Sequence, residues 1–285
     1  MRKSDIWIIN DQRLEDGYNG ITQYFIDTFK NNDLDFEILY NSHFKIDKDK
    51  LFYDDTEVCL PKIVFYRVKD EKLEKFFDKS DVILINNAKS RNLCDDKYTL
   101  HNLLASCNIK NFKQPKYFLY DNQTYETLKN MLASKFVMKD NFGRMGGNCF
   151  LIENKQQFDE ALKNKNIQFL CQEYISHSVG TDLRFFVVHN KVAGTMQRIN
   201  ENDWKSNLAT GGRSISYEAT ENQKQLAIEI AQKIGAEIMS VDFLFGENQL
   251  YFCEANSAPG VKGFMALDIN VVDIICKFFK ELLKN

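Results

Sequence analysis

Three oxygen-bearing side chains lie in two apolar stretches near the C-terminus. Asp242 falls within residues 240–245, and Glu254 and Asn256 fall within residues 250–256. Carboxylates in such Val-, Phe- and Leu-rich stretches are costly to bury unless a cation or a hydrogen-bonding partner compensates them. Their hard oxygens suit Mg²⁺, which typically fills its other positions with water and nucleotide phosphates. The pattern predicts half of an ATP site, and the alternative is an edge hairpin whose polar residues only face water.

The spacing of these three residues constrains the hairpin that carries them. Glu254 and Asn256 are two residues apart and share a face, and Asp242 joins that face only if an even-numbered residue lies opposite it. We therefore expect a loop of three or five residues over 246–249. A two-residue turn would send Asp242 to the other face unless a bulge compensates it.

The composition describes a globular protein of balanced charge. The chain has 285 residues, 44% of them hydrophobic and 13% aromatic, with 40 acidic residues against 37 basic ones. The net charge of −3 removes the electrostatic argument for a nucleic acid or an anionic membrane as partner. Seven scattered cysteines without a CxxC pair are typical of a reducing compartment. Because the N-terminal apolar run is too short for a signal peptide, we expect a cytoplasmic protein without membrane segments.

The N-terminal third alternates short apolar strands with polar helical stretches, which is the signature of a small parallel α/β layer. The expected elements are strands at 6–10, 36–40, 63–67 and 82–86, with helices after Gly20 and from Asp70. A bridging helix over 95–107 follows, with Asp95 as its expected N-cap.

The rest of the chain predicts two α+β lobes. The central lobe should hold strands from 117 and at 136–139, 149–152 and 169–174, with helices from Asn122 and Asn154. The C-terminal lobe should hold strands at 183–188 and 191–199, a loop over 201–214, a helix over 221–234, the ligand-bearing hairpin and a helix from Asp268. We therefore divide the chain into residues 1–92, 93–175 and 176–285.

A glycine-rich loop between two predicted strands could close its backbone amides over phosphate oxygens. It contains Gly143, Gly146 and Gly147 but lacks the Gly-Lys-Ser/Thr of a P-loop, so a flexible hairpin is an equal alternative. Lys139 ends the strand directly before this loop, and Lys97 lies near the start of the bridging helix. Either cation can neutralise a phosphate, although lysines at the ends of elements are usually only solvated.

Further polar segments suit a nucleotide and an anionic substrate. Residues 172–175 end an apolar strand with backbone groups and an acidic side chain that suit an adenine edge and a ribose, although an ordinary strand exit explains them too. Asp182 and Arg184 alternate on the next strand, and Arg198 closes its partner. The following loop supplies Lys205, Ser206, Asn207 and Arg213, which an exposed basic loop also explains. The absence of a triad or a nucleophile elbow leaves covalent nucleophilic catalysis unsupported.

Taken in order, these motifs resemble the ATP-grasp fold, specifically its RimK-like branch of carboxylate–amine ligases. The matching segments are Asp96-Lys97, Val137-Met-Lys139, Gly143 to Gly147, Gln172 to Ile175, Gly180 to Arg184, Lys205 to Asn207, Gly211-Gly212, Val241-Asp242 and Glu254 to Gly260. The resemblance covers about residues 62–285. It implies an α/β and α+β protein in which two α+β lobes sandwich ATP behind a small N-terminal α/β domain.

The resemblance also implies a role for each matching residue. ATP contacts fall to Lys97, Lys139, Gly143, Gly146, Gly147, Glu173, Tyr174, Ile175, Asp182, Lys205, Ser206 and Asn207. Two Mg²⁺ ions, for which Mn²⁺ may substitute, fall to Asp242, Glu254 and Asn256. Catalytic contacts to the transferred phosphoryl group fall to Arg198, Lys205 and Asn207. Arg67, Arg184 and Arg213 would contact a substrate that carries more than one carboxylate.

Two features depart from the family pattern. Lys205 stands where arginine is common, and Phe142, Arg144 and Met145 stand in the glycine-rich loop where small or acidic residues are usual. A bulky, cationic loop tip would alter substrate choice or the rate of loop closure.

The sequence thus predicts an ATP-dependent ligase. The carboxylate of a small molecule or peptide attacks the γ-phosphate, and an amine displaces the resulting acyl phosphate, with release of ADP and phosphate. Glutamate or a glutamyl-ended peptide fits the arginines, and a homodimer or homotetramer is plausible from the resemblance. Two alternatives keep the fold but change the outcome: a small-molecule kinase, and a nucleotide-binding module without turnover.

Overall fold

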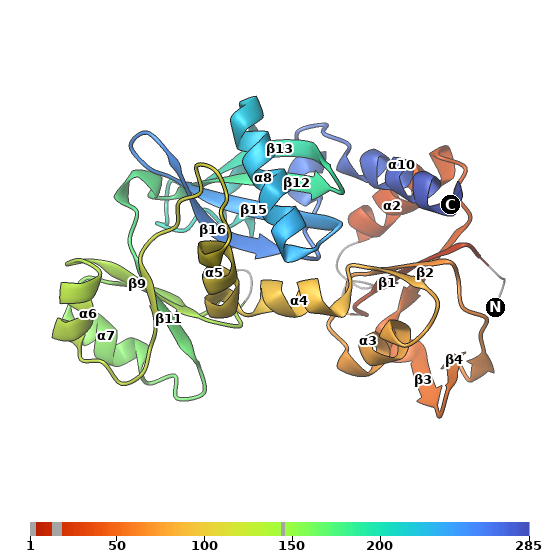
Figure 1. The fold of residues 1–285 in the computed structure, drawn as a ribbon, viewed down its shortest axis with the longest axis horizontal. Helices are drawn as coiled ribbons and strands as arrows, with labels where there is room; N and C mark the ends of the chain where they lie inside the picture. Colours follow the sequence, from red (N-terminus) through yellow and green to blue (C-terminus); the bar gives the residue numbers. More distant parts are fainter. Residues whose placement is uncertain (1–3, 13–18, 144–145, 285) are drawn as a thin grey trace.

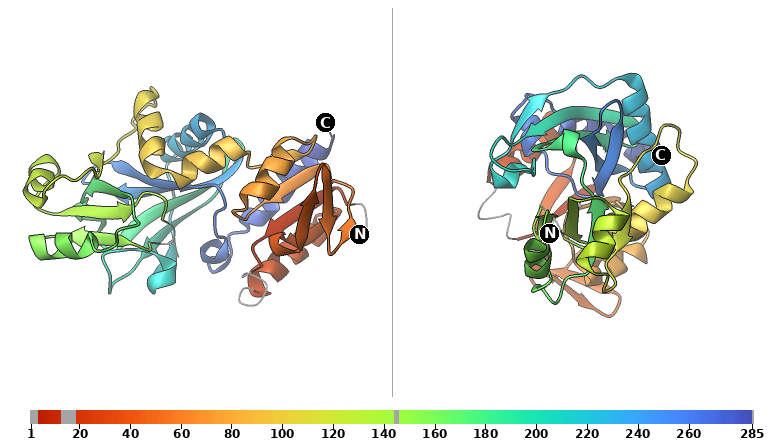
Figure 2. Two further views of the ribbon diagram at one scale, coloured as in Figure 1. Left: turned by 90° about the horizontal axis from the view of Figure 1, so that it is seen from below. Right: turned by 90° about the vertical axis from the view of Figure 1, so that its left-hand side faces the viewer.

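The computed structural model describes residues 4–12, 19–143 and 146–284, and within them the molecule is elongated (Figure 1). An N-terminal α/β unit lies at one end, a small lobe built on β9 and β11 lies at the other, and a five-stranded sheet lies between them. The further views show the same arrangement from below and end-on (Figure 2). No helix in the described part of the chain is long and apolar enough to cross a membrane.

The N-terminal unit is built on a four-stranded parallel sheet of order β2-β1-β6-β7. Its elements are β1 (Ile6–Asn10), α2 (Asn19–Asn31), β2 (Phe36–Tyr40), β6 (Ile63–Tyr66), α3 (Glu71–Asp78) and β7 (Ile83–Ile85). The two central strands are buried along their whole length, which explains why they read as continuous apolar runs. The predicted parallel layer is confirmed. Asp70 is the N-cap of α3, in agreement with the helix that was expected to begin there.

A three-stranded antiparallel sheet that the sequence did not predict covers one face of this layer. It consists of β3 (Phe44–Asp47), β4 (Lys50–Tyr53) and β5 (Thr56–Glu57), preceded by a 3₁₀ turn, η1 (Asn41–His43). The ring of Phe44 lies 5.9 Å from that of Trp7 in β1. Strands this short carry too few alternating positions to stand out from a loop.

The bridging helix that was expected over 95–107 is present, and a second helix that was not expected precedes it. They are α4 (Ala88–Asp95) and α5 (Lys97–Ser106). The expected N-cap at Asp95 is wrong: Asp95 ends α4, whereas Asp96 has an extended backbone and accepts a hydrogen bond from Thr99 N at 3.0 Å. The buried face of α4 consists of Ser90, Arg91 and Cys94, so it lacks the apolar periodicity that would reveal the helix.

The central lobe is an antiparallel sheet of order β10-β9-β11-β8 with two short helices on one face. Its elements are β8 (Tyr117–Leu119), α6 (Tyr125–Met131), β9 (Phe136–Asp140), β10 (Cys149–Ile152), α7 (Lys155–Ala161) and β11 (Phe169–Glu173). Asn154 caps α7 as expected. The helix expected from Asn122 begins at Tyr125, because Thr124 is its cap.

The C-terminal sheet has the order β14-β13-β12-β15-β16. Its strands are β12 (Thr181–Val188), β13 (Lys191–Ile199), β14 (Arg213–Ser216), β15 (Ile238–Phe245) and β16 (Leu250–Asn256). The other elements are η2 (Ser176–Ser178), η3 (Leu208–Thr210), α8 (Glu221–Ile234), α9 (Lys262–Met265) and α10 (Val271–Lys284).

A capping box at Thr220 and left-handed Gly235 (φ 75°) fix the ends of α8 as predicted. The helix expected from Asp268 begins at Val271. The division of the chain at residues 92 and 175 stays a prediction.

The N-terminal unit and the C-terminal sheet share one apolar core. That core joins Ile8, Phe25 and Phe65 to Phe186 and Phe279, and α10 packs against α2 (Figure 1). The core of the central lobe, by contrast, contains only side chains from residues 118–171. In the part of the chain that the structure describes, the N-terminal unit therefore packs onto the C-terminal sheet.

Buried Asn86 joins the two units by hydrogen bonds. Its Nδ2 donates to the carbonyl oxygens of Ile238 at 2.5 Å and Ser257 at 2.7 Å. Its Oδ1 accepts from the backbone amides of Glu237 at 2.8 Å and Ile238 at 3.0 Å. Because Ser257 directly follows Asn256, this residue ties the end of β7 to the end of the ligand-bearing hairpin.

We predict that Asn86→Ala lowers the free energy of unfolding by about 3 kcal/mol, because buried backbone groups lose their partners at four hydrogen bonds. Urea denaturation of the purified protein measures the change. Asn164→Ala is the matched control, since exposed Asn164 donates a single local bond to Ala161 O at 3.0 Å, and it should shift stability by less than about 0.5 kcal/mol. Equal effects of the two variants would contradict a role for Asn86 in joining the units.

Candidate active site

The hairpin between β15 and β16 closes with a tight turn. The amide of Gly246 donates to Gln249 O at 2.8 Å, so only two residues lie between this pair. A Cβ on Gly246 would lie 2.5 Å from the ring of Tyr251, which leaves room for glycine alone. The expected loop of three or five residues is therefore wrong.

A bulge restores the alignment that the tight turn would have lost. Phe243 lies opposite Phe252, but Asp242 lies opposite Glu254, so Cys253 is the extra residue in β16. The shift by one residue turns Glu254, and Asn256 after it, to the face that Asp242 occupies. The hairpin thus meets the geometric condition for a shared metal site by a different route from the one expected.

One face of the C-terminal sheet carries a row of charged residues across three strands. Arg184 in β12 lies opposite Asp242 in β15, which lies opposite Glu254 in β16. Further along the same face, Phe186 and Ile238 belong to the core shared with the N-terminal unit. The face is therefore polar at the end toward the central lobe and apolar at the end toward α10.

Asp242 is fully buried and is surrounded by guanidinium donors. Arg184 Nε and NH2 lie 2.8 Å and 2.5 Å from its two carboxylate oxygens, and Arg198 NH2 lies 2.7 Å from Oδ2. Burial alone would raise the pKa of Asp242, but Arg184 and Arg198 outweigh it and hold that pKa below its ordinary value. Asp242 is consequently an anion at neutral pH.

Arg198 joins two buried carboxylates. Its Nε lies 2.7 Å from Asp182 Oδ1, and its NH2 also donates to Asp182 Oδ2 and to Asp242. Burial acts to lower the pKa of Arg198, but Asp242 and Asp182 outweigh that effect and raise it. Burial raises the pKa of Asp182, an effect that the charge of Arg198 opposes. With Arg184, the cluster holds two positive and two negative groups, so its charges balance.

Two lysines, Lys139 in β9 of the central lobe and Lys97 at the start of α5, lie near the hairpin. Lys139 Nζ lies 3.4 Å from the carbonyl oxygen of Cys253, the bulged residue of β16. Lys97 Nζ lies 2.5 Å from Gly143 O and 3.3 Å from Asn141 O. Both lysines are largely buried, and burial lowers the pKa of Lys97 while the charge of Glu254 opposes that shift. Neither forms an ion pair within 4 Å among the described residues, so both can offset a bound anion.

The loop after β13 lies between the two lobes. Gly180 (φ 63°) donates to Trp204 O at 2.8 Å and accepts from Asn200 N at 2.7 Å, and a Cβ there would lie 2.2 Å from Asn200 O. At the far side of the loop, a Cβ on Gly146 would lie 2.8 Å from Asn207 Oδ1. Glycines at these two positions allow the loop to approach both β12 and the glycine-rich loop.

The remaining residues of this loop complete the same side of the cluster. Ser206 is buried and hydrogen-bonds to Asp182. Lys205 is partly buried, with Nζ 3.9 Å from Asp203 Oδ2. Gly147 is exposed at the glycine-rich loop. Arg144 and Met145 lie outside the described residues.

The strand end expected to hold adenine lies at the boundary between the lobes. Glu173 Oε2 accepts from Lys116 N at 3.1 Å, Ile175 precedes η2, and the ring of Tyr174 lies 6.3 Å from that of Trp204. Among the described residues, the buried Nε2 of Gln172 finds no hydrogen-bond partner. A hollow of about 420 Å³ is lined by Trp204 and by residues 149–153. An unsatisfied donor at this boundary fits a nucleobase acceptor.

The donor set on the hairpin fits Mg²⁺ by its chemistry. Asn256 Nδ2 lies 3.4 Å from Glu254 Oε1, so an amide and a carboxylate are adjacent. Asp242 Oδ1 accepts one hydrogen bond, which leaves a lone pair for a cation. In the described part of the chain no cluster of three or more His, Cys, Asp or Glu residues could hold a metal. A cation held by these two carboxylates and one amide would therefore take its other ligands from phosphate and water.

Two of the predicted arginines lie apart from this cluster. Arg213 is exposed and pairs with Glu201 at 3.1 Å, on the edge strand β14. Arg67 directly follows β6 in the N-terminal unit. The other predicted side chains lie on the two facing lobes and on the loop between them.

Sequence reasoning missed two functional candidates that the geometry reveals. Cys253 presents its carbonyl to Lys139 because of a bulge, and no local residue pattern announces that bulge. Gln172 was part of a recognised motif but received no role. The sequence feature that could have revealed it is a polar residue within the apolar strand 169–173. In the sheet, Gln172 lies on the same face as Lys139 of the neighbouring strand β9.

Comparison with protein families gives a match to the RimK-like ATP-grasp domain over residues 94–278. A probable alpha-L-glutamate ligase of Stenotrophomonas maltophilia is 32% identical over 196 residues, which is 66% of each chain. An uncharacterised protein of Mycoplasma pneumoniae, the MG012 homolog, is 28% identical over 239 residues, covering 80% of this chain and 81% of its own.

Among solved structures, the ATP-grasp ligase PsnB, complexed with a minimal precursor, superimposes with a TM-score of 0.75 at 13% identity. The match covers 97% of this chain and 98% of PsnB. The fold predicted from the motifs, two α+β lobes preceded by a small α/β domain, is confirmed.

We predict that Arg198→Gln lowers the free energy of unfolding by about 3–5 kcal/mol at pH 8, because buried Asp182 loses its counter-ion and Asp242 keeps only Arg184. In the wild type, the lowered pKa of Asp242 contributes stability above its unfolded value of about 4, which is lost as the pH falls below it. In the variant, a carboxylate without its counter-ion has a raised pKa. The difference in the free energy of unfolding between the variant and the wild type should therefore shrink as the pH falls toward 5.

Urea denaturation at pH 5 and pH 8 tests this prediction. Arg213→Gln is the control, since it breaks an exposed ion pair and should change stability by less than about 1 kcal/mol at either pH. A difference between Arg198→Gln and wild type that is independent of pH would contradict the proposed charge balance.

Proposed function

This chain belongs to the RimK-like ATP-grasp family, and we propose that it joins a substrate carboxylate to an amine through an acyl phosphate. It is an ATP-dependent ligase that forms carbon–nitrogen bonds. One observation carries the proposal: Arg184, Asp242 and Glu254 form a row across three strands, with Lys139 of the facing lobe within reach of the same hairpin. Such an array stabilises charge on a transferred phosphoryl group and supplies no nucleophile.

Nucleotide binding is assigned to the facing lobes. Lys97 and Lys139 offset phosphate charge, and the amides of the glycine-rich loop cover the phosphates. Lys205, Ser206 and Asn207 approach the terminal phosphate from the loop after β13. Residues 172–175 hold the adenine and ribose, where the free amide donor of Gln172 supports a contact to the base.

The metal site is assigned to Asp242, Glu254 and Asn256. ATP-grasp ligases use ATP and Mg²⁺; we propose two ions here, for which Mn²⁺ can substitute. When bound, Mg²⁺ supplies Lewis-acid stabilisation of the phosphate oxygens. Arg184 donates two hydrogen bonds to Asp242 and is therefore the residue that must share this carboxylate with a cation.

The reaction proceeds without a covalent bond to the protein. A carboxylate oxygen of the acid attacks the γ-phosphorus, and the bond between that phosphorus and the β–γ bridging oxygen breaks to release ADP. The amine nitrogen then attacks the acyl carbon, phosphate leaves with its bonding electron pair, and the nitrogen loses a proton. Arg198 offsets the charge of the acyl phosphate. Asp182 holds Arg198 in place through both carboxylate oxygens.

The relatives support glutamate or another amino acid as one substrate. Two or more positive groups near the reacting centre favour a substrate with a second carboxylate. A cytoplasmic location and a homodimer or homotetramer stay predictions.

We predict that ATP binds only weakly without Mg²⁺, because the carboxylate of Glu254, which lies outside the balanced cluster, then faces the triphosphate with like charge. Isothermal titration calorimetry with Mg²⁺ and with EDTA measures the difference. Equal affinity in both conditions would show that the hairpin is not a metal site.

Hydroxylamine distinguishes a ligase from a kinase without knowledge of the natural amine. The correct acid, Mg-ATP and hydroxylamine should yield a hydroxamate with one ADP per product and no AMP, because the site is arranged around the terminal phosphate. Glu254→Ala should abolish hydroxamate and ADP together. AMP and pyrophosphate as products, or an unchanged rate in Glu254→Ala, would rule out this mechanism.

A further inference from the structure

Asn141 directly follows β9 and joins the end of that strand to the start of α5. It is almost fully buried, with 1% of its surface exposed. Its Oδ1 accepts from the backbone amide of Tyr98 at 2.8 Å, and its Nδ2 donates to Asp96 Oδ1 at 2.9 Å. Tyr98 lies in the first turn of α5, and Asp96 is the N-cap of that helix. One side chain thus ties the central sheet to a helix whose buried leucines belong to the core of the C-terminal sheet.

The contact between Asn141 and Asp96 is a charge-assisted hydrogen bond. Burial acts to raise the pKa of Asp96, but hydrogen bonds from Thr99 and Asn141 outweigh it and hold that pKa below its ordinary value. Asp96 is therefore an anion at neutral pH, and a donor bonds more strongly to an anion than to a neutral group. An apolar side chain at position 141 would leave the amide of Tyr98 without this acceptor and Asp96 without this donor.

The backbone of Asn141 holds Lys97, which lies between these two partners in the sequence. The carbonyl oxygen of Asn141 accepts from the backbone amide of Lys97 at 3.2 Å and lies 3.3 Å from Lys97 Nζ. Gly143 O accepts from the same ammonium group at 2.5 Å. Two carbonyls at the base of the glycine-rich loop therefore fix this ammonium group. They can do so only while the turn over 141–143 stays in contact with α5.

Lys97 needs fixed partners because a second cation lies close to it. Burial lowers the pKa of Lys97, and the charge of Lys139 acts in the same direction. Two ammonium groups at short range repel each other, and in a poorly solvated site that repulsion is stronger than in water. A carbonyl group accepts a hydrogen bond but carries no net charge. The two carbonyls therefore hold Lys97 and leave its charge available to an anion.

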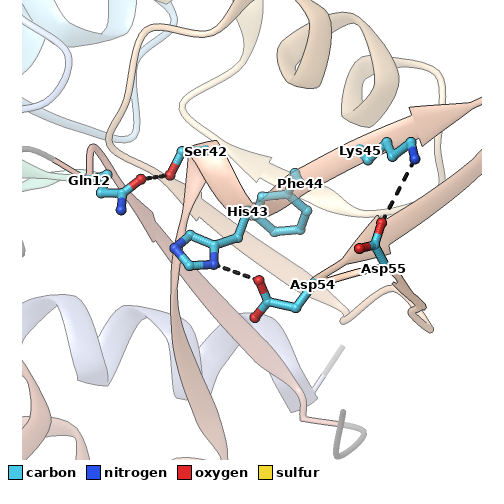
Figure 3. Close-up of a pocket in the computed structure, with 7 residues that line it drawn as sticks. All are labelled: Gln12, Ser42, His43, Phe44, Lys45, Asp54 and Asp55. Atoms are coloured by element: carbon cyan, nitrogen blue, oxygen red, sulfur yellow. Dashed lines mark hydrogen bonds and ion pairs between the residues drawn. The ribbon is translucent and has the colours of Figure 1, made fainter.

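A hollow in the N-terminal unit shows the opposite arrangement. It has a volume of about 450 Å³, and its basic residues face carboxylates, His43 with Asp54 at 2.6 Å and Lys45 with Asp55 at 3.8 Å (Figure 3). A carboxylate offsets the charge of a basic group within the protein. A lysine pair in which one member is held by carbonyls is instead arranged for an anion with several charges, such as a triphosphate.

We propose that Asn141 is a positioning residue that holds Lys97 against the repulsion of Lys139 and so sets the spacing of these two charges for the triphosphate of ATP. This inference rests on the proposed function, which assigns the phosphates to the two lysines. Charges that are already in place need no rearrangement when the anion binds. The adenine and ribose are assigned to residues 172–175 instead, so a change at position 141 should affect phosphate binding alone.

Isothermal titration calorimetry of Asn141→Leu with Mg-ATP and with adenosine tests this inference. Leucine has a similar volume but makes neither hydrogen bond, so the Kd for Mg-ATP should rise at least about tenfold. Adenosine carries no phosphate, and its Kd should stay within about twofold of the wild-type value. Wild-type affinity of Asn141→Leu for Mg-ATP, or an equal loss for both ligands, would overturn the positioning role.

Two further variants separate this role from a general loss of stability. The double variant Asp96→Asn with Asn141→Asp restores the hydrogen bond in the opposite direction and keeps the net charge, so its Kd for Mg-ATP should lie within about threefold of wild type. Leu104→Ala opens a cavity about two turns along α5 from Lys97. It should lower the melting temperature and leave the Kd for Mg-ATP unchanged.

The outcomes distinguish this inference from the function on which it rests. No recovery of affinity in the double variant, or an equal rise of the Kd in Leu104→Ala, overturns the positioning role of Asn141. Failure of the wild-type protein to bind Mg-ATP overturns the proposed function itself.

Discussion

The carboxylate of Asp242, fully buried yet charged, is the constraint on which the active face depends. An isolated ion at that depth would be very costly, so the fold must bring guanidinium groups to it. Arg184 comes from the neighbouring strand β12 and Arg198 from β13, one strand farther away. Arg198 in turn requires Asp182. A single buried charge thereby fixes the relative register of three strands, and the balanced cluster leaves the charges of Glu254 and the two lysines available to ligands.

The bulge at Cys253 allows that constraint to coexist with a tight hairpin. A two-residue turn suits the twist of the strands, but it places the ligands out of phase. One extra residue corrects the phase at the point where the metal ligands begin. It also places the carbonyl of Cys253 where Lys139 of the facing lobe can donate to it. Local strand geometry and contact between the lobes are in this way coupled at one residue.

Much of the fold could be predicted because strong local signals mark it. The buried strands β1 and β6, the capping residues Asp70, Asn154 and Thr220, and the alternation in β12 and β13 all lie in the sequence. The short sheet β3-β4-β5 and helix α4 were missed, since the first has too few alternating positions and the second buries polar residues. At the site, residue types indicated Asp242, Glu254 and Asn256, which the structure places on one face, and their role as metal ligands stays a prediction. The partners of Asp242, the bulge and the unsatisfied amide of Gln172 depend on contacts between distant segments, which no local pattern encodes.

The bonding of Asn86 has a mechanical consequence for how the cleft opens. Through it and the shared core, the N-terminal unit and the C-terminal sheet form one body. The central lobe has a core of its own, and hydrogen bonds join it to the rest of the molecule, from Lys139 to the hairpin and between Asn141 and the start of α5. A lobe that is joined by hydrogen bonds and shares no core can move as a unit, so the hinge for admitting ATP and releasing ADP falls at the segments that lead into and out of the central sheet, around residues 113–116 and 174–175. The N-terminal unit stays fixed to the hairpin during this motion, so the side of the site that it borders keeps its shape while the nucleotide is exchanged.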